Sequence, residues 1–370
     1  MATDLRLLRF LRAPRFFVLA CTVLLAACAV TPEQAAKPAK RALWPQPPDR
    51  PRFVYETVLR SAADIRVPQK GTEKLMTELT GLQSTADTPV FEKPAAVAAR
   101  NGNIFVADTR TRSIVVFDVP RRKVFRFGLR QPGTLQQPAG LALDAEMNVY
   151  VADSKRRQVI VYDQLGLFQR AIGGPADLER PTGVAVSPDG ERIYAIDRSD
   201  NESDRHCVVV YDKEGTKLKV IGTRGRGDGQ FNVPLQGAVA PDGTLYVLDS
   251  GNFRVQAFDR DGKFLRAFGS PGVNPGNLAR PRGIAVDDDG NIYVSDASFN
   301  NFQIFSPDGQ LLLTVGEASR DSRPGQYGLL SGISVDETGR VYVVDQLFNK
   351  VEVIRRLSEA EGNKILQAAK

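Results

Sequence analysis

The sequence predicts an all-β fold, a six-bladed β-propeller of four-stranded antiparallel blades, and three observations support this prediction. First, an aromatic strand that ends in aspartate occurs six times, as in NIYVSD at residues 291–296. Second, the closing aspartates lie 45, 44, 52, 47 and 49 residues apart, and self-similarity at such a period indicates a repeat architecture. Third, β-branched and aromatic runs alternate with turn residues such as Asp-Gly, which is typical of hairpins in a propeller blade. The closing aspartates are Asp108, Asp153, Asp197, Asp249, Asp296 and Asp345.

The segment 1–27 predicts a signal peptide. Four arginines precede an apolar run at positions 16–30, which is shorter than the roughly 20 residues that a membrane span needs. The segment Leu25-Ala-Ala-Cys28 resembles a bacterial lipobox, and this resemblance implies cleavage before Cys28 and lipid attachment there. Ala29 then favours an outer-membrane anchor facing the periplasm over retention in the inner membrane. An uncleaved N-terminal anchor is the alternative.

Residues 28–52 predict a flexible tether rich in Pro and Ala that begins at the lipidated Cys28. The whole chain has 49 Lys and Arg against 43 Asp and Glu, and the segment 1–27 holds four Arg and one Asp. Removing that segment therefore lowers the formal charge from +6 to +3. This small excess is poor evidence for nucleic-acid binding. Cys21 leaves with the signal peptide, so Cys207 has no partner for a disulfide.

The propeller is assigned to residues 53–356. Five copies of the repeat end in a fourth strand, and the sixth lacks one. A strand at residues 53–59 is expected to supply it, so that the two ends of the ring latch together. Residues 72–82 predict a short amphipathic helix that either packs on one mouth of the propeller or binds a partner. The tail at 357–370 carries a helix-capping signal at Ser358.

Three motifs recur in register between residues 93 and 355: Pro-x-Gly-Val/Ile-Ala-Val-Asp, Gly-Asn-Ile-Tyr-Val-x-Asp and Arg-Val-x-x-Phe-Asp. Together they resemble the NHL repeat family, and the fourth copy, at 246–259, matches closely. WD40 blades are disfavoured because the chain has one Trp and one His. In related propellers the turns after the repeat aspartates share a face with the blade-to-blade connections, and ligands commonly bind there.

The sequence predicts no catalytic residue, no metal and no cofactor. The repeat aspartates are interpreted as structural, because every blade needs the turn that such a residue can cap. A single histidine excludes a three-histidine zinc site. The residue after each leading proline is expected near one mouth of the central channel, and none is a carboxylate of the kind that lactonase-like propellers place on a metal. These six residues are Ala95, Ala139, Thr182, Leu235, Arg282 and Ser331.

The turns after the aspartates give a basic arc in blades one to three and an aromatic and amide arc in blades four to six. Exposed aromatic side chains on adjacent turns mark an interaction site. The alternative is that the aromatic rings tuck under neighbouring turns and the arginines are solvated or paired. The candidate ligand-binding residues are Arg112, Arg156, Arg157, Phe253, Arg254, Phe299 and Phe348.

Together these features predict a lipid-anchored periplasmic propeller that binds or scaffolds a protein, a peptide or a cell-envelope glycan without performing chemistry. Its arginines would meet acidic groups, and its phenylalanines would meet apolar or ring surfaces. A metal-dependent lactonase-like hydrolase that uses the central channel is the alternative. Single-stranded RNA binding, which some cytoplasmic NHL proteins perform, conflicts with the export signal. The oligomeric state stays open.

Overall fold

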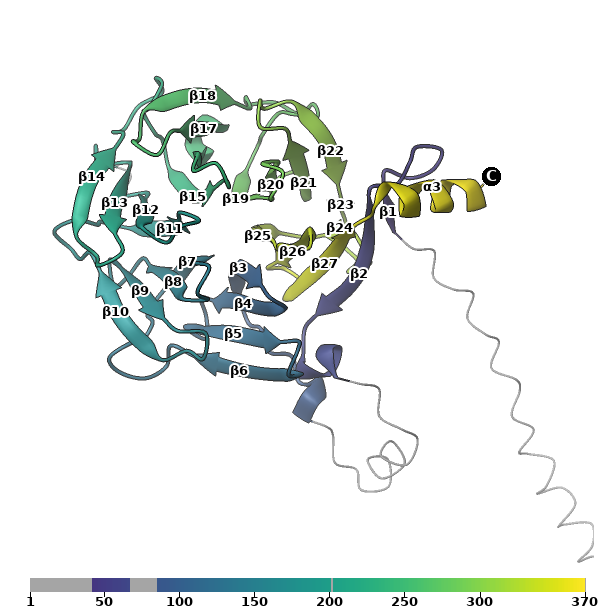
Figure 1. Cartoon of the computed structure of the whole chain (residues 1–370), viewed down its shortest axis with the longest axis horizontal. Coiled ribbons are helices and arrows are strands. Elements are labelled where there is room, and N and C mark those ends of the chain that lie inside the picture. The colour runs from purple at the N-terminus through teal and green to yellow at the C-terminus, as the bar shows by residue number, and fades with distance from the viewer. Residues whose placement is uncertain (1–41, 67–84, 201, 370) are drawn as a thin grey trace, which may run out of the picture. The chain divides into compact units, whose positions relative to one another are not determined.

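The computed structural model describes residues 42–66, 85–200 and 202–369, which form a ring of β-sheets (Figure 1). The predicted signal peptide, Cys28 and the helix expected at 72–82 lie outside the described residues. Within the described part of the chain, no helix is both long and apolar enough to cross a membrane.

Six antiparallel sheets make up the ring, and each is one propeller blade. The first strand of a blade lines the central channel and the fourth lies at the rim (Figure 1). Blade 1 contains β3 (Pro94–Arg100), β4 (Asn103–Asp108), β5 (Ser113–Asp118) and β6 (Lys123–Phe127); blade 2 contains β7 (Pro138–Leu143), β8 (Val149–Asp153), β9 (Gln158–Tyr162) and β10 (Phe168–Ile172); and blade 3 contains β11 (Pro181–Val186), β12 (Arg192–Asp197), β13 (Cys207–Asp212) and β14 (Lys217–Ile221). Blade 4 contains β15 (Pro234–Val239), β16 (Leu245–Asp249), β17 (Arg254–Phe258) and β18 (Phe264–Phe268), and blade 5 contains β19 (Pro281–Val286), β20 (Ile292–Asp296), β21 (Asn301–Phe305) and β22 (Leu311–Val315).

Blade 6 is built from both ends of the propeller, which confirms the predicted latch. Its own strands are β25 (Leu330–Val335), β26 (Arg340–Asp345) and β27 (Lys350–Arg356). The N-terminal strand β2 (Phe53–Leu59) pairs antiparallel with β27 and supplies the outer position. The ring is therefore closed by backbone hydrogen bonds between a strand that precedes the first blade and the last strand of the sixth.

The last part of the predicted tether is not a linker. Residues 42–52, which were assigned to it, are part of the propeller. Strand β1 (Leu43–Trp44) pairs with the start of β2 and adds a fifth strand to blade 6. The Trp44 side chain packs against the apolar cluster between blades 5 and 6 and against Gly325. Burial of the apolar indole ring in this contact is favourable in free energy relative to its exposure to water. This burial explains why the segment packs on the propeller.

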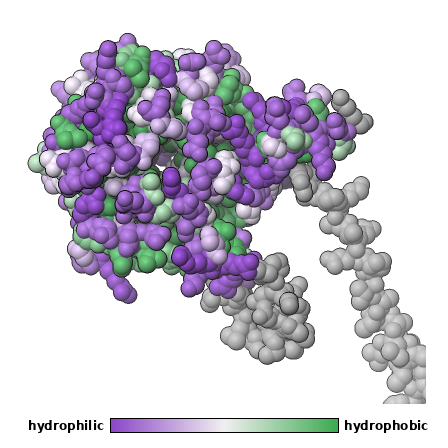
Figure 2. Space-filling view, viewed as in Figure 1, coloured by the Kyte–Doolittle hydropathy of each residue, from purple (hydrophilic) through white to green (hydrophobic). Residues whose placement is uncertain are grey.

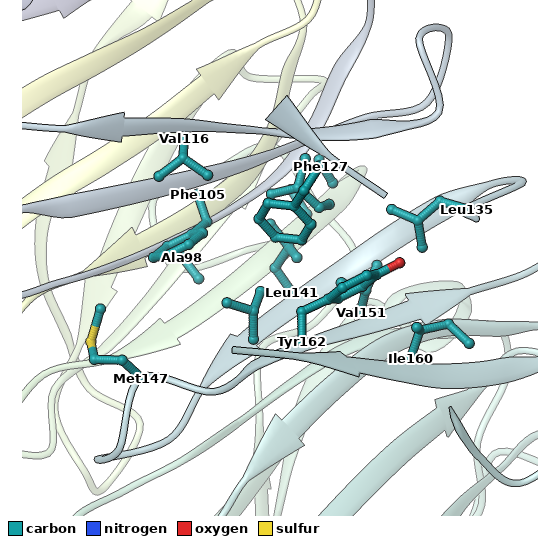
Figure 3. Packing of buried hydrophobic residues seen from close by; sticks show 14 residues of the cluster. Ala98, Phe105, Val116, Phe127, Leu135, Leu141, Met147, Val151, Ile160 and Tyr162 are labelled. Carbon is teal, nitrogen blue, oxygen red and sulfur yellow. The ribbon is translucent and has the colours of Figure 1, made fainter. Parts of the chain in front are cut away.

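The apolar core consists of clusters that each join two neighbouring blades. Figure 3 shows the cluster between blades 1 and 2, where the ring centroids of Phe127 and Tyr162 lie 4.8 Å apart. Blade 6 shares one cluster with blade 5 and another with blade 1. The latch strand takes part in both, through Phe53 in the first and Leu59 in the second. Since a blade cannot bury both faces alone, the ring is one cooperative unit.

Short elements complete the part of the chain that the structure describes. The terminal helix α3 (Glu359–Ala368) begins at Ser358, whose side chain accepts from the Glu361 amide, which confirms the predicted cap. The Glu361 carboxylate also pairs with Arg355 at 3.0 Å. The remaining elements are β23 (Glu317–Ala318), β24 (Gln326–Tyr327) and three short 3₁₀ turns, η1 (Ala62–Ile65), η2 (Thr85–Asp87) and η3 (Ser250–Asn252).

A fully buried ion pair fixes β27, and its disruption should be costly. Lys350 Nζ lies 2.6 Å from Glu352 Oε1, and the two side chains are 0% and 2% exposed. Replacing Lys350 by Met should lower the free energy of unfolding by about 3–5 kcal/mol, because Glu352 would remain buried without its cation. Urea denaturation would measure this loss. A Lys350→Met/Glu352→Gln double variant should recover much of it, and a double variant as unstable as the single one would contradict this account.

Candidate functional site

A β-bulge near the start of each inner strand shapes one mouth of the central channel. In five blades the pairing shifts by one residue just after the leading proline, and in blade 6 it shifts after Leu330. A bulge redirects the side chain of the extra residue. All six residues that the sequence placed here line the mouth: Ala95, Ala139, Thr182, Leu235, Arg282 and Ser331.

The inner strands approach one another closely just beyond this mouth. A Cβ atom added to Gly140 would lie 2.7 Å from the backbone of Gly183 in the next blade, and one added to Gly332 would lie 2.7 Å from Ala96. The convergence of the blades on the channel axis therefore favours glycine at these two positions.

The mouth forms a polar cavity of about 230 Å³ with several cations. Lys93, Arg180, Arg198 and Arg282 line it, together with the side-chain amides of Gln137, Gln236 and Gln346. Gln236 reaches across the throat, where its Nε2 donates to the carbonyls of Thr182 and Ala139 at 2.9 and 3.3 Å. The lining residues include no histidine and no carboxylate. The cavity therefore suits a negatively charged or polar ligand.

The sequence predicted only some of the residues that line this cavity. It anticipated the bulged residues, but it missed Lys93, Arg180, Gln137 and Gln346 as parts of one site. The signal is positional: the residue before a leading proline and the residue after a repeat aspartate lie at the same end of adjacent strands. The strand register shows this directly, because Pro94 pairs with Asp108 and Pro181 with Asp197.

The six repeat aspartates are structural, as predicted. Each is 0% exposed, and each accepts backbone amides from its own turn or from the loop that enters its blade. Asp153 accepts from Gln136, Gln137, Lys155 and Arg156 at 2.6 to 3.1 Å. The amides of the entering loop were not anticipated, since they precede the aspartate by 16 or 17 residues. These carboxylates hold the connections at the mouth in place. Their oxygen atoms accept hydrogen bonds within the fold.

Three of the candidate arginines donate hydrogen bonds to loop carbonyls on the same face. Arg156 donates to the carbonyls of Pro132 and Thr134, and Arg157 donates to the carbonyl of Leu178. Arg254 pairs with the buried Asp249 at 2.9 Å and donates to two loop carbonyls. Their guanidinium groups are thus already occupied within the fold. Arg112, by contrast, is exposed and has no side-chain partner among the described residues.

The three candidate phenylalanines are half-buried. Phe253 packs against the apolar cluster between blades 4 and 5, and Phe348 lies over Lys350 with 5.5 Å from Nζ to the ring centroid. Phe299 is half-buried on the turn of blade 5. The exposed apolar residue on this arc is Leu347, beside Phe348, at 58%. The phenylalanines of this arc therefore keep part of their surface inside the fold, and Leu347 beside them is exposed.

Cys207 is buried on β13 and should be unreactive. Burial raises the pKa of its thiol to about 12, so at pH 9 only about one thiol in a thousand is ionised. In a chain that begins at residue 42 it is the single cysteine. A thiol reagent at pH 9 should therefore label one equivalent only after unfolding in guanidinium. Rapid labelling of the native chain would contradict this burial.

Within the described residues, no group of three or more His, Cys, Asp or Glu side chains is placed to hold a metal ion. The acidic turn Asp287-Asp-Asp-Gly290 is held by hydrogen bonds within the turn and its hairpin. Asp287 accepts from the amides of Asp289 and Asn291 and from the Tyr293 hydroxyl at 2.9 Å.

Fold and site together define a six-bladed β-propeller with a polar, cationic channel mouth. The NHL repeat family matches residues 278–305, which span β19, β20 and β21 of blade 5. The chain is therefore a six-bladed propeller that carries an NHL repeat. A search of curated proteins finds no match to the sequence.

Several solved structures share the fold at low sequence identity. A structural genomics protein of unknown function from Bacteroides thetaiotaomicron is 17% identical over 81% of this chain and 76% of its own, with a TM-score of 0.60. A gluconolactonase from Xanthomonas campestris is 20% identical over 72% and 88%, with a TM-score of 0.54. A virginiamycin B lyase from Staphylococcus aureus is 12% identical over 72% and 96%, with a TM-score of 0.51. At these identities the likeness concerns the fold alone.

Proposed function

We propose that this protein is a lipid-anchored periplasmic binding module that performs no chemistry of its own. Its lipid would be attached at Cys28 and hold it at the outer membrane. Its partner would be a protein, a peptide or a cell-envelope glycan, bound on the face that contains the channel mouth and the turns after the repeat aspartates. No nucleic acid and no cofactor are required by this function.

One observation carries the proposal: the channel mouth is lined by amides, hydroxyls and cations, with neither a carboxylate nor a histidine among its lining residues. Such a site can donate many hydrogen bonds but has no group suited to act as a general base. The lactonase-like alternative requires oxygen ligands for a divalent cation. A cationic lining repels such an ion, so the fold's likeness to a gluconolactonase does not favour that chemistry here.

The lining of the mouth is consistent with recognition through polar contacts. Figure 2 shows one face of the ring as largely hydrophilic, with apolar residues in separate groups. Among the candidate residues, Arg112 is exposed and Phe299 is half-buried. Both can contact a partner without breaking a side-chain hydrogen bond or ion pair with another described residue. Leu347 adds an exposed apolar contact.

A pull-down from native envelope extract tests the proposal. The full chain should retain a specific partner, and an Arg112→Glu/Phe299→Ala/Leu347→Ser variant should lose it while keeping its circular dichroism spectrum. Arg122→Glu is the matched control, because Arg122 is also exposed but follows β5, in a turn at the opposite end of the blade. Retention by the triple variant, or equal loss in the control, would contradict the assigned face.

A further inference from the structure

Positive charge gathers on one side of the channel mouth. Arg180 precedes β11 and Arg198 follows β12, so both come from blade 3, while Arg282 is the bulged residue of β19 in blade 5. All three are half-buried and line the same cavity. Arg280 adds a fourth charge close to Arg282. Like charges brought this near in a partly dry site repel one another.

The fold does not neutralise this cluster. Arg282 has no hydrogen bond or ion pair with any described residue, and Arg198 Nε is buried without a partner. Arg180 has one exposed carboxylate, Asp200, at 4.0 Å. The buried carboxylate that precedes Arg198 in the chain, Asp197, already accepts the amides of Glu179, Arg180 and Ser199 at 2.7 to 2.9 Å.

The electrostatic environment of the two central arginines agrees with this geometry. Burial lowers the pKa of Arg282 below its usual value, and the charges of Arg280 and Arg198 lower it further. Burial also lowers the pKa of Arg198, with Arg180 as the next contributor. Guanidinium groups stay protonated even so. The three arginines therefore carry a permanent positive charge and have N–H donors without partners. A bound anion would stabilise both.

From these observations we propose that the channel mouth is a binding site for a small multivalent oxyanion, either a phosphate or a polycarboxylate. The planar guanidinium groups of Arg180, Arg198 and Arg282 would bind its oxygens in bidentate fashion. The side-chain amides of Gln137 and Gln346, which have no partner among the described residues, supply further donors. A cavity of about 230 Å³ accommodates an anion of this size with some water. This inference rests on the binding role proposed above and adds a small-anion site to the same face.

Calorimetric titration of the full chain in detergent, at constant ionic strength set by chloride, tests the site. Inorganic phosphate and citrate are the two probes, and acetate is the monovalent comparison. At least one multivalent probe should bind in a 1:1 ratio and at least tenfold more tightly than acetate. Phosphate alone would identify the preferred oxyanion as phosphate, and citrate alone would identify it as a polycarboxylate.

Variants separate the site from the stability of the fold. Arg198→Gln/Arg282→Gln should weaken binding of the probe at least tenfold. Arg282→Gln alone should melt at the same temperature as the wild type or higher in anion-free buffer, because it removes a repelled charge that has no partner. The matched control, Arg122→Gln, removes one exposed charge at the other end of blade 1 and should leave the affinity within twofold.

The inference is overturned if neither phosphate nor citrate binds, if acetate binds as tightly, or if the double variant keeps its affinity. A large drop in the melting temperature of Arg282→Gln would also count against it, since that result assigns Arg282 a structural role. Failure here is distinct from failure of the proposed function. The pull-down variants change Arg112, Phe299 and Leu347, outside the cavity lining, so each experiment reports on its own site.

Discussion

A chain that begins at residue 60 should be less stable than one that begins at residue 42 by about 6–12 kcal/mol, on the scale of about 1.5–3 kcal/mol for each large apolar side chain buried. The shorter chain lacks β1 and β2, and with them the buried side chains of Phe53, Val54 and Leu59 and the packed ring of Trp44. The truncation also exposes the edge of β27, which is a template for association with other chains. Urea denaturation gives the loss, and size-exclusion chromatography reports the association.

Two further measurements make this expectation specific to the latch. A peptide of residues 42–60 added in trans should raise the melting temperature of the truncated chain, because it can pair with the free edge of β27. A chain that stops after Leu357 is the control. It lacks α3, which buries only Gly362 and forms ion pairs at the surface, so it should lose about 2 kcal/mol or less. Equal stability of the chains that begin at residues 42 and 60 would show that the ring closes without its latch.

The latch could be predicted from the sequence because a strand was missing. Hairpin chemistry defined four strands in five blades and three in the sixth, and a lone strand at residues 53–59 stood before the first blade. Strand periodicity and turn residues are short-range signals, so they can be recognised in a single sequence. The five predicted fourth strands are present as β6, β10, β14, β18 and β22.

The sites depend on contacts that short-range patterns do not encode. Arg156 was placed correctly on the turn after Asp153, but its bonds go to carbonyls 22 and 24 residues earlier in the chain. Nothing in the sequence of the turn distinguishes such a guanidinium from a free one. Trp44 likewise sits among prolines that suggest a linker, and its ordering depends on a surface near Gly325. The cationic mouth was missed for the same reason, since its arginines come from blades 3 and 5.

The second large effect concerns the repeat aspartates. Asp153→Ala should lower the free energy of unfolding by about 4–12 kcal/mol, because four backbone amides lose a shared buried acceptor and each unsatisfied group costs about 1–3 kcal/mol. Asp153→Asn keeps one acceptor oxygen and should lose roughly half as much. Chemical denaturation of both variants measures the difference.

The matched control for this substitution is Asp163→Ala in the same blade. Asp163 also accepts two backbone amides, from Leu165 and Leu167 at 2.9 Å, but it is half-exposed at the turn between β9 and β10. Water can replace it there, so its loss should cost about 1 kcal/mol. If Asp153→Ala were no worse than Asp163→Ala, the aspartates would not organise the mouth. Because Asp153 holds the loop at residues 136–137, its loss should also disorder the lining beside Gln137, and hydrogen exchange at those amides should rise before the rest of the ring opens.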